Sequence, residues 1–238
     1  VYQMADTALN PKHRISDIIG RPLELNLGVR SKEKREKISD ILKMVDLQTD
    51  FASRFPHELS GGQKQRVNLA RALAAGPEIV LCDEVTSALD TIVSANVIEL
   101  LKRLRRDTGV SFVFISHDLS TVASFADEIV VLYAGRVAER GPTDQVLSPP
   151  YHPYTQLLIS SVPEMRVGWL EETLQRQETL AGISRGVTLT NVGCPFFNRC
   201  PVAIEGTCDK VDPPQRYDPN GHGHFIECHR ELDELTSG

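Results

Sequence analysis

The stretch LSGGQKQRVNLARALAAGPEIVLCDEVTSALD, residues 59–90, decides the fold of this chain. Ser60 is a favourable first residue for a helix, and the helical run over residues 63–74 stops before Gly76-Pro77. Two glycines directly after Ser60 let another molecule approach the backbone closely. Because the first N–H groups of a helix are unpaired and lie at its positive end, a phosphate is the ligand that suits this turn.

A short apolar run, Ile79–Cys82, follows the predicted helix. Its length and composition predict a strand that is buried on both faces of a parallel sheet. Asp83 and Glu84 come next, at the carboxyl end of the strand, where open α/β sheets bind ligands. We expect Asp83 to hold Mg²⁺. We expect Glu84 to polarise the water that attacks a phosphate.

A second apolar strand is predicted over Val110–Ile115, and Ser116-His117-Asp118 follows it. The end of this strand should lie at the same sheet edge as Glu84. We therefore expect His117 to hydrogen-bond the terminal phosphate and to keep the attacking water in register with Glu84.

The other elements are predicted from apolar spacing and breaking residues. Residues 15–55 read as helical, with a break at Arg21-Pro22 and a later helix over Lys32–Val45. A further helix is predicted over residues 92–106 and a β-hairpin over residues 128–140.

In this order and spacing the motifs resemble those of ABC-type ATPases. Residues 59–63 resemble the signature motif, Ile79–Glu84 the Walker B strand, Asp90 the D-loop and His117 the H-loop, while Val1-Tyr2-Gln3 resembles the Q-loop. The resemblance implies an α/β fold with an incomplete P-loop NTPase-like core. It implies a nucleotide-binding domain over residues 1–141, with a helical subdomain over about residues 12–75.

The same resemblance implies ATP and Mg²⁺ as cofactors. Catalytic roles would fall to Glu84, His117 and Gln3, with Gln3 and Asp83 reaching the Mg²⁺ ion. Contacts to the nucleotide or its dimer seam are expected from Ser60, Gly61, Gly62, Gln63, Asp83 and Asp90.

No Gly-x-x-x-x-Gly-Lys-Ser/Thr loop occurs in the sequence, although P-loop NTPases use it to hold the β- and γ-phosphates. In the family this loop precedes the Q-loop. We therefore expect the chain to be a fragment of a longer protein, the alternative being a protein that lost this half. By itself the chain should not hydrolyse ATP.

From residue 142 to residue 238 the composition changes. The proline- and tyrosine-containing stretch at residues 149–155 and the later cysteine-containing segments resemble the region that follows the nucleotide-binding core in the peptide/nickel branch of ABC importers. That branch includes the dipeptide and oligopeptide transporters. The resemblance implies a subunit that powers peptide import, with nickel or other small-solute import as a variant.

Four of the five cysteines lie in this region, with the spacing C-x5-C-x7-C-x19-C: Cys194, Cys200, Cys208 and Cys228. Disulfides are disfavoured in the cytoplasm, so we expect a bound metal. The paired C-x2-C knuckles of zinc ribbons are absent, and a [4Fe–4S] cluster is the preferred interpretation. Zn²⁺ is the alternative, since His222, His224 and His229 could substitute as zinc ligands.

Composition limits the partners. The chain has 238 residues and a net charge of −6, without a basic cluster that would indicate nucleic-acid binding. No apolar run approaches the roughly 18 residues of a membrane span. The resemblance to ABC ATPases implies a peripheral location, on the cytoplasmic face of the membrane. It also implies as partners a second ABC ATPase domain (in a homo- or heterodimer), transmembrane permease subunits and, indirectly, an extracytoplasmic substrate-binding protein.

Two other classes of protein share these motifs or this fold. A DNA-repair or chromosome-organising ATPase would carry the same motifs, but it would also carry long heptad segments, which this sequence lacks. A nonhydrolysing regulatory module with the same fold would not need Glu84 and His117. The transported substrate is set by subunits outside this chain.

Overall fold

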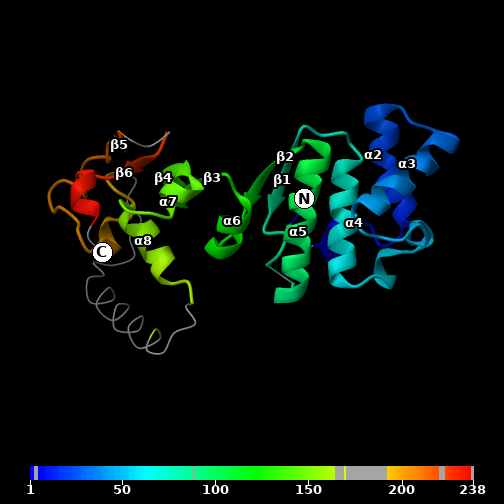
Figure 1. Ribbon diagram of the computed structural model, residues 1–238, viewed down its shortest axis with the longest axis horizontal. Coiled ribbons are helices and arrows are strands. Elements are labelled where there is room, and N and C mark those ends of the chain that lie inside the picture. Colours follow the sequence, from blue (N-terminus) through cyan, green and yellow to red (C-terminus); the bar gives the residue numbers. More distant parts are fainter. Residues whose placement is uncertain (3–4, 88, 164–168, 170–191, 220–222, 237–238) are drawn as a thin grey trace. The chain divides into compact units, whose positions relative to one another are not determined.

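The computed structural model describes the chain except for residues 3–4, 88, 164–168, 170–191, 220–222 and 237–238 (Figure 1). It divides into two compact units, Val1–Thr121 and Val122–Gly238. The domain boundary expected after residue 141 falls inside the second unit and stays a prediction.

The first unit is mainly helical and contains a small parallel sheet. Its longer helices α2, α3, α4 and α5 are drawn in blue to green in Figure 1. Helix α2 packs against both α3 and α4, and α4 also contacts α5. The predicted helices over residues 63–74 and 92–106 are confirmed as α4 and α5. The helical elements are α1 (Ala5–Ala8), α2 (Ile15–Leu27), α3 (Ser31–Met44), η1 (Thr49–Ser53), η2 (Pro56–Glu58), α4 (Gly61–Leu73) and α5 (Thr91–Thr108).

The predicted break at Arg21-Pro22 is wrong, because α2 continues through Pro22 to Leu27. A proline inside a helix removes one backbone hydrogen bond and favours a kink. Here Ile19 and Leu23 are almost fully buried on the face that packs against the neighbouring helices. Burial of these side chains stabilises the helix enough to offset the missing bond.

The parallel sheet consists of β1 (Ile79–Asp83) and β2 (Ser111–Ile115), with Asp83 opposite Ile115. The predicted second strand is thereby confirmed. On the other edge of β1, the Val1 backbone nitrogen donates to the Leu81 carbonyl at 2.5 Å, and the Asp83 N–H donates to the Val1 carbonyl at 3.1 Å.

The prediction that β1 is buried on both faces is wrong for the structure as described. Val80 and Cys82 are buried, whereas the Ile79 and Leu81 side chains that alternate with them are 63% and 51% exposed. Successive strand residues point to opposite faces, so an apolar run becomes fully buried only when both faces are covered. Among the described residues, helices α4 and α5 line only one face of β1, the face that carries Cys82.

In the second unit an antiparallel sheet has the strand order β3-β4-β6-β5. The predicted hairpin is confirmed as β3 and β4, and positive φ angles at Ala134 (49°) and Gly135 (78°) form the turn that such hairpins favour. The sheet then continues into the cysteine-containing region through β6. The elements are β3 (Glu128–Tyr133), β4 (Arg136–Pro142), α7 (Thr143–Val146), α8 (Pro153–Ser160), η3 (Phe197–Arg199), β5 (Gln215–Tyr217), β6 (Phe225–Glu227) and η4 (Leu232–Leu235), after α6 (Leu119–Phe125) at the boundary between the units.

Within the described part of the chain, no helix combines the length and the apolar character needed to cross a membrane.

Candidate functional site

The turn after β1 fixes the backbone of Glu84. Its N–H donates to the Ile115 carbonyl of β2 at 3.0 Å, and its own carbonyl accepts from the N–H and hydroxyl of Ser87 at 3.2 and 3.0 Å. Glu84 has a positive φ of 45°, a conformation that costs a residue with a side chain about 1–2 kcal/mol. Such strain is concentrated at functional sites.

The parallel strands bring two predicted site residues together. The Glu84 Oε1 atom lies 3.3 Å from His117 Nδ1, although the two residues are 33 positions apart. The His117 side chain is 71% exposed and that of Glu84 is 29% exposed, so the pair is open to a ligand. After His117, partial burial raises the pKa of Asp118, but hydrogen bonds from Ser120 and Thr121 hold that pKa below its ordinary value. This turn fixes the chain directly after His117.

The glycine-rich turn begins α4 as a capping box. Ser60 Oγ accepts from the Gln63 N–H at 3.4 Å, and Gln63 Oε1 accepts from the Ser60 N–H at 3.0 Å. The side chains of Ser60 and Gln63 are therefore both used to start the helix. The first-turn N–H groups at Gly61 and Gly62 then remain as the donors that a helix offers to an anion.

The first turns of α4 and α5 lie against each other. Asp90 caps α5 by accepting from the Val93 N–H at 2.9 Å. A Cβ atom on Gly62 would lie 2.7 Å from Val93 Cγ1, whereas one on Gly61 would lie 3.9 Å from the nearest side-chain atom, on Leu89. Gly62 therefore lacks a side chain partly because α5 occupies the space. The predicted signature and D-loop residues thus share one end of the helical layer.

Gln3 lies outside the described residues, but two side chains that sequence reasoning missed hold the chain on either side of it. Asn68 Nδ2 donates to the Tyr2 carbonyl at 3.3 Å, and Arg71 donates to the Ala8 carbonyl at 2.5 Å and to Asn68 Oδ1 at 2.7 Å. Burial lowers the pKa of Arg71. The only signal for this role in the sequence was the presence of two polar residues, Asn68 and Arg71, three positions apart in the predicted helix.

The second unit contains the other predicted site. Cys200, Cys208 and Cys228 are buried and Cys194 is half-buried, and all four are free thiols. Burial is the main cause that raises the pKa of Cys194 to about 11 and that of Cys200 to about 12, and the charges of the other three cysteines contribute to the Cys200 value. Without a cation nearby, these groups would stay protonated at neutral pH.

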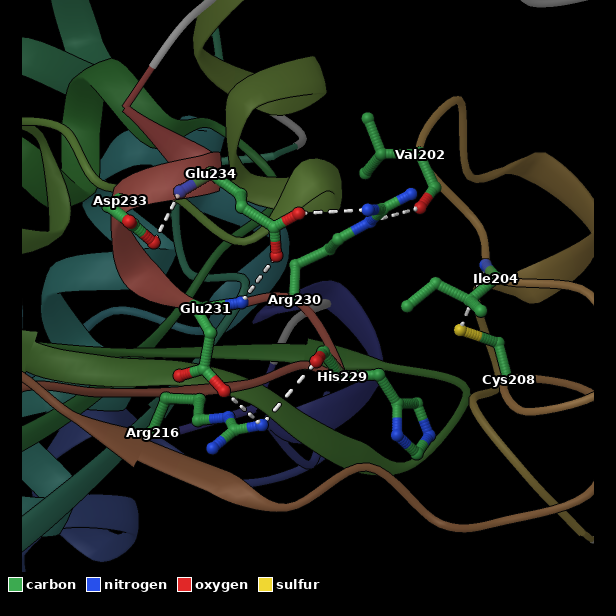
Figure 2. Close-up of polar contacts among 9 residues, drawn as sticks. All are labelled: Val202, Ile204, Cys208, Arg216, His229, Arg230, Glu231, Asp233 and Glu234. Atoms are coloured by element: carbon green, nitrogen blue, oxygen red, sulfur yellow. Dashed lines mark hydrogen bonds and ion pairs between the residues drawn. The ribbon is translucent and has the colours of Figure 1, made fainter.

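Each of the four thiols also accepts a backbone N–H. The donors are Phe196 and Phe197 for Cys194, Val202 for Cys200, Ile204 for Cys208, and Arg230 and His229 for Cys228. The Ile204 N–H lies 3.3 Å from the Cys208 sulfur (Figure 2). Hydrogen bonds of this kind favour the thiolate over the thiol.

No group of three or more His, Cys, Asp or Glu side chains in the described residues is arranged to hold a metal ion. Two of the predicted alternative zinc ligands have other partners. His224 Nε2 lies 2.8 Å from Glu139 Oε1, and His229 Nε2 lies 2.9 Å from the Val211 carbonyl. The third, His222, lies outside the described residues.

Comparison with known proteins finds a family match in each of the two regions. Residues 1–87 match the family model described as ABC transporter, and residues 138–208 match the one described as oligopeptide/dipeptide transporter, C-terminal region. The dipeptide transport ATP-binding protein DppF of Haemophilus influenzae is 39% identical over 228 residues, which cover 96% of this chain and 68% of that protein. The chain belongs to the ABC transporter family of ATP-binding proteins.

Further relatives of this ABC protein show the same extent of similarity. The oligopeptide transport ATP-binding protein AppF of Bacillus subtilis is 37% identical over 230 residues, 96% of this chain and 68% of that protein. A Brucella abortus relative is 40% identical over 216 residues, 91% of this chain but 63% of its own length. The chain therefore spans 56–68% of the length of these and similar relatives.

Solved structures give the fold of the cassette. The ATP-binding cassette MJ0796, solved as a dimer in a post-hydrolysis state with ADP and Pi, is similar with a TM-score of 0.53 and 35% identity. The similarity covers 60% of this chain and 61% of that one. The expected α/β ABC ATPase fold is confirmed, while the role of each site residue in this ABC protein stays a prediction.

Proposed function

We propose that this chain forms part of the ATP-binding and ATP-hydrolysing subunit of an ABC importer for dipeptides or oligopeptides. The contact between Glu84 and His117 carries the proposal, since it places a carboxylate and an imidazole at the edge where β1 and β2 end. The two relatives named for dipeptide and oligopeptide transport support the substrate class.

The proposed chemistry divides between neighbouring side chains. Glu84 accepts a proton from the attacking water, and His117 keeps Glu84 in register and hydrogen-bonds the terminal phosphate. Asp83 ends β1 beside Glu84 and suits Mg²⁺, which spreads the negative charge of the phosphate oxygens when bound. Gln3 would complete the set from the segment that Asn68 and Arg71 hold.

The N-terminus of α4 serves a different nucleotide in this proposal. Its N–H groups at Gly61 and Gly62 would close on ATP held by a second ABC ATPase domain. Gly62 touches Val93, so that closure would also move the first turn of α5, which Asp90 caps. This coupling would transmit nucleotide binding to transmembrane permease subunits from the cytoplasmic face of the membrane, with an extracytoplasmic substrate-binding protein delivering the peptide.

Glu84→Gln in the natural protein that contains this chain tests the chemistry. The amide keeps the side-chain volume but cannot accept a proton, so turnover should fall by at least ~10²-fold while ATP binding stays close to wild type. Glu78→Gln is the matched control, because Glu78 is exposed just before β1 and away from His117. Near-normal steady-state hydrolysis by Glu84→Gln would refute the role of Glu84.

We further propose that the four cysteines hold a metal centre, with a [4Fe–4S] cluster preferred over Zn²⁺. The backbone donors at every sulfur support thiolate ligands, and the buried sulfurs lie close enough for their charges to interact. A single zinc ion needs four sulfurs within about 4 Å of one another, given Zn–S bonds of about 2.3 Å. A cluster suits more widely spaced sulfurs, and when bound it would tie the four segments together. Iron, acid-labile sulfide and zinc per chain, measured after anaerobic purification, test this proposal.

A further inference from the structure

Arg230 connects two of the cysteine segments (Figure 2). Its Nε atom donates to the Val202 carbonyl at 3.0 Å, and its Nη1 atom donates to Glu234 Oε1 at 2.9 Å. Its own backbone N–H donates to the Cys228 thiol. One residue therefore supplies a main-chain donor to one cysteine and a side-chain clamp to the segment that carries another.

The clamped segment begins with Cys200. The Val202 N–H donates to the Cys200 thiol, and the Val202 carbonyl is the acceptor for Arg230. Val202 is thus held from both sides. Loss of the Arg230 guanidinium would leave the Val202 carbonyl without this bond. The Val202 N–H, which donates to the Cys200 thiol, would then be free to move.

The other end of the clamp is also fixed. Glu234 Oε2 accepts from the Glu231 N–H at 2.9 Å, which starts η4, and buried Leu235 packs with Ile226 and Cys228. Glu234 therefore holds the guanidinium from a turn that is anchored beside Cys228. The positively charged Arg230 also lies two residues after Cys228 in the chain.

We propose that Arg230 is a positioning residue for the four-cysteine centre, holding the Cys200 segment against Cys228 through its bond to the Val202 carbonyl. This inference rests on the metal site proposed above. In this inference Arg230 is not a metal ligand but holds two ligand segments together. Glu234 of the C-terminal turn η4 orients the Arg230 side chain.

The first experiment uses the metal-free, reduced chain and does not depend on a cluster. Iodoacetamide labelling of each cysteine is followed by peptide mass spectrometry in wild type, Arg230→Met, Arg230→Lys and Arg140→Ala. Arg230→Met keeps much of the length and the packing but loses the donor and the charge. The Cys200 segment should then open more often, and exposure of the buried thiol should raise its labelling rate about tenfold over wild type. Cys194 should change less, because the guanidinium of Arg230 bonds to Val202 and Glu234 rather than to the segment that begins with Cys194.

Arg230→Lys, which keeps a donor and the charge, should restore most of the protection of Cys200. Arg140 pairs with Glu128 at 3.3 Å on the hairpin, so Arg140→Ala controls for the loss of an arginine in the same unit. Equal Cys200 rates in wild type and Arg230→Met would overturn the positioning role, whether or not the protein binds metal.

The second experiment reconstitutes the same variants anaerobically with Fe²⁺ and inorganic sulfide. Arg230→Met should release iron to a chelator about tenfold faster than wild type. Its reduction potential should shift downward, because a positive charge near the centre has been removed. Arg230→Lys should keep the wild-type potential. Wild-type protein that takes up no iron would refute the metal centre and the metal part of this inference, while the labelling result alone decides whether Arg230 holds the Cys200 segment.

Discussion

Glu139 offers the sharpest test of how the second unit is held together. It lies on β4 and its side chain is fully buried. Oε1 lies 2.8 Å from Nε2 of His224, which is itself 1% exposed, and Oε2 accepts from the buried His152 N–H at 2.8 Å. One carboxylate therefore joins β4 to the start of α8 and to the residue before β6.

Glu139→Leu removes both acceptors and leaves two buried donors unsatisfied. Each such donor costs about 1–3 kcal/mol, so the free energy of unfolding should fall by roughly 2–6 kcal/mol. Glu139→Gln keeps the volume and one oxygen acceptor, and its cost should be about 1–2 kcal/mol. The difference between the two variants separates lost hydrogen bonds from altered packing.

Hydrogen exchange of the Phe225–Glu227 amides in β6 measures the opening of this sheet directly, and urea unfolding provides the global value. Glu128→Gln is the control, because Glu128 lies on β3 in an exposed pair with Arg140 and should change stability by less than about 1 kcal/mol. A Glu139→Leu cost below about 1 kcal/mol would show that Glu139 does not hold the strands together.

Burial lowers the pKa of His152 from 6.5 to about 4. The stability that comes from burying the neutral imidazole is therefore complete above pH 6.5 and is lost as the pH falls toward 4. This loss should be roughly 3 kcal/mol in acid unfolding curves, and His152→Asn should remove it. Gly62→Ala should lower thermal stability through its contact with Val93. Gly61→Ala should not, because among the described residues its added Cβ would meet only Leu89, at 3.9 Å; equal melting temperatures would contradict this. Ser60→Ala should cost about 1 kcal/mol in urea unfolding, since it removes the helix cap.

Local patterns were sufficient for several elements. Residues 61–73 form a helix because Ser60 and Gln63 cap it, and both residues are read directly from the sequence. The hairpin turn at Ala134-Gly135 and the strand before His117 follow from composition in the same way. Spacing along the chain also placed Glu84 and His117 at strand ends, from which their proximity follows once the strands are parallel.

Other features required the tertiary structure, because they depend on what covers a side chain rather than on its neighbours in sequence. Pro22 remains inside a helix because burial of Ile19 and Leu23 compensates for the lost bond. Covered and exposed residues alternate along β1 because, among the described residues, helices line only the face that carries Cys82.

The polar contacts of the second unit were the least predictable. Glu139 occurs in an ordinary strand sequence, and nothing local indicates that it is buried against two histidines. Arg230 likewise gains its role from a carbonyl 28 positions away. The sequence by itself determined which groups could bind phosphate or metal, since that depends on residue type and local backbone. Only the tertiary structure decided which of these groups meet and which buried partners hold them, because long-range hydrogen bonds form only after distant segments have packed.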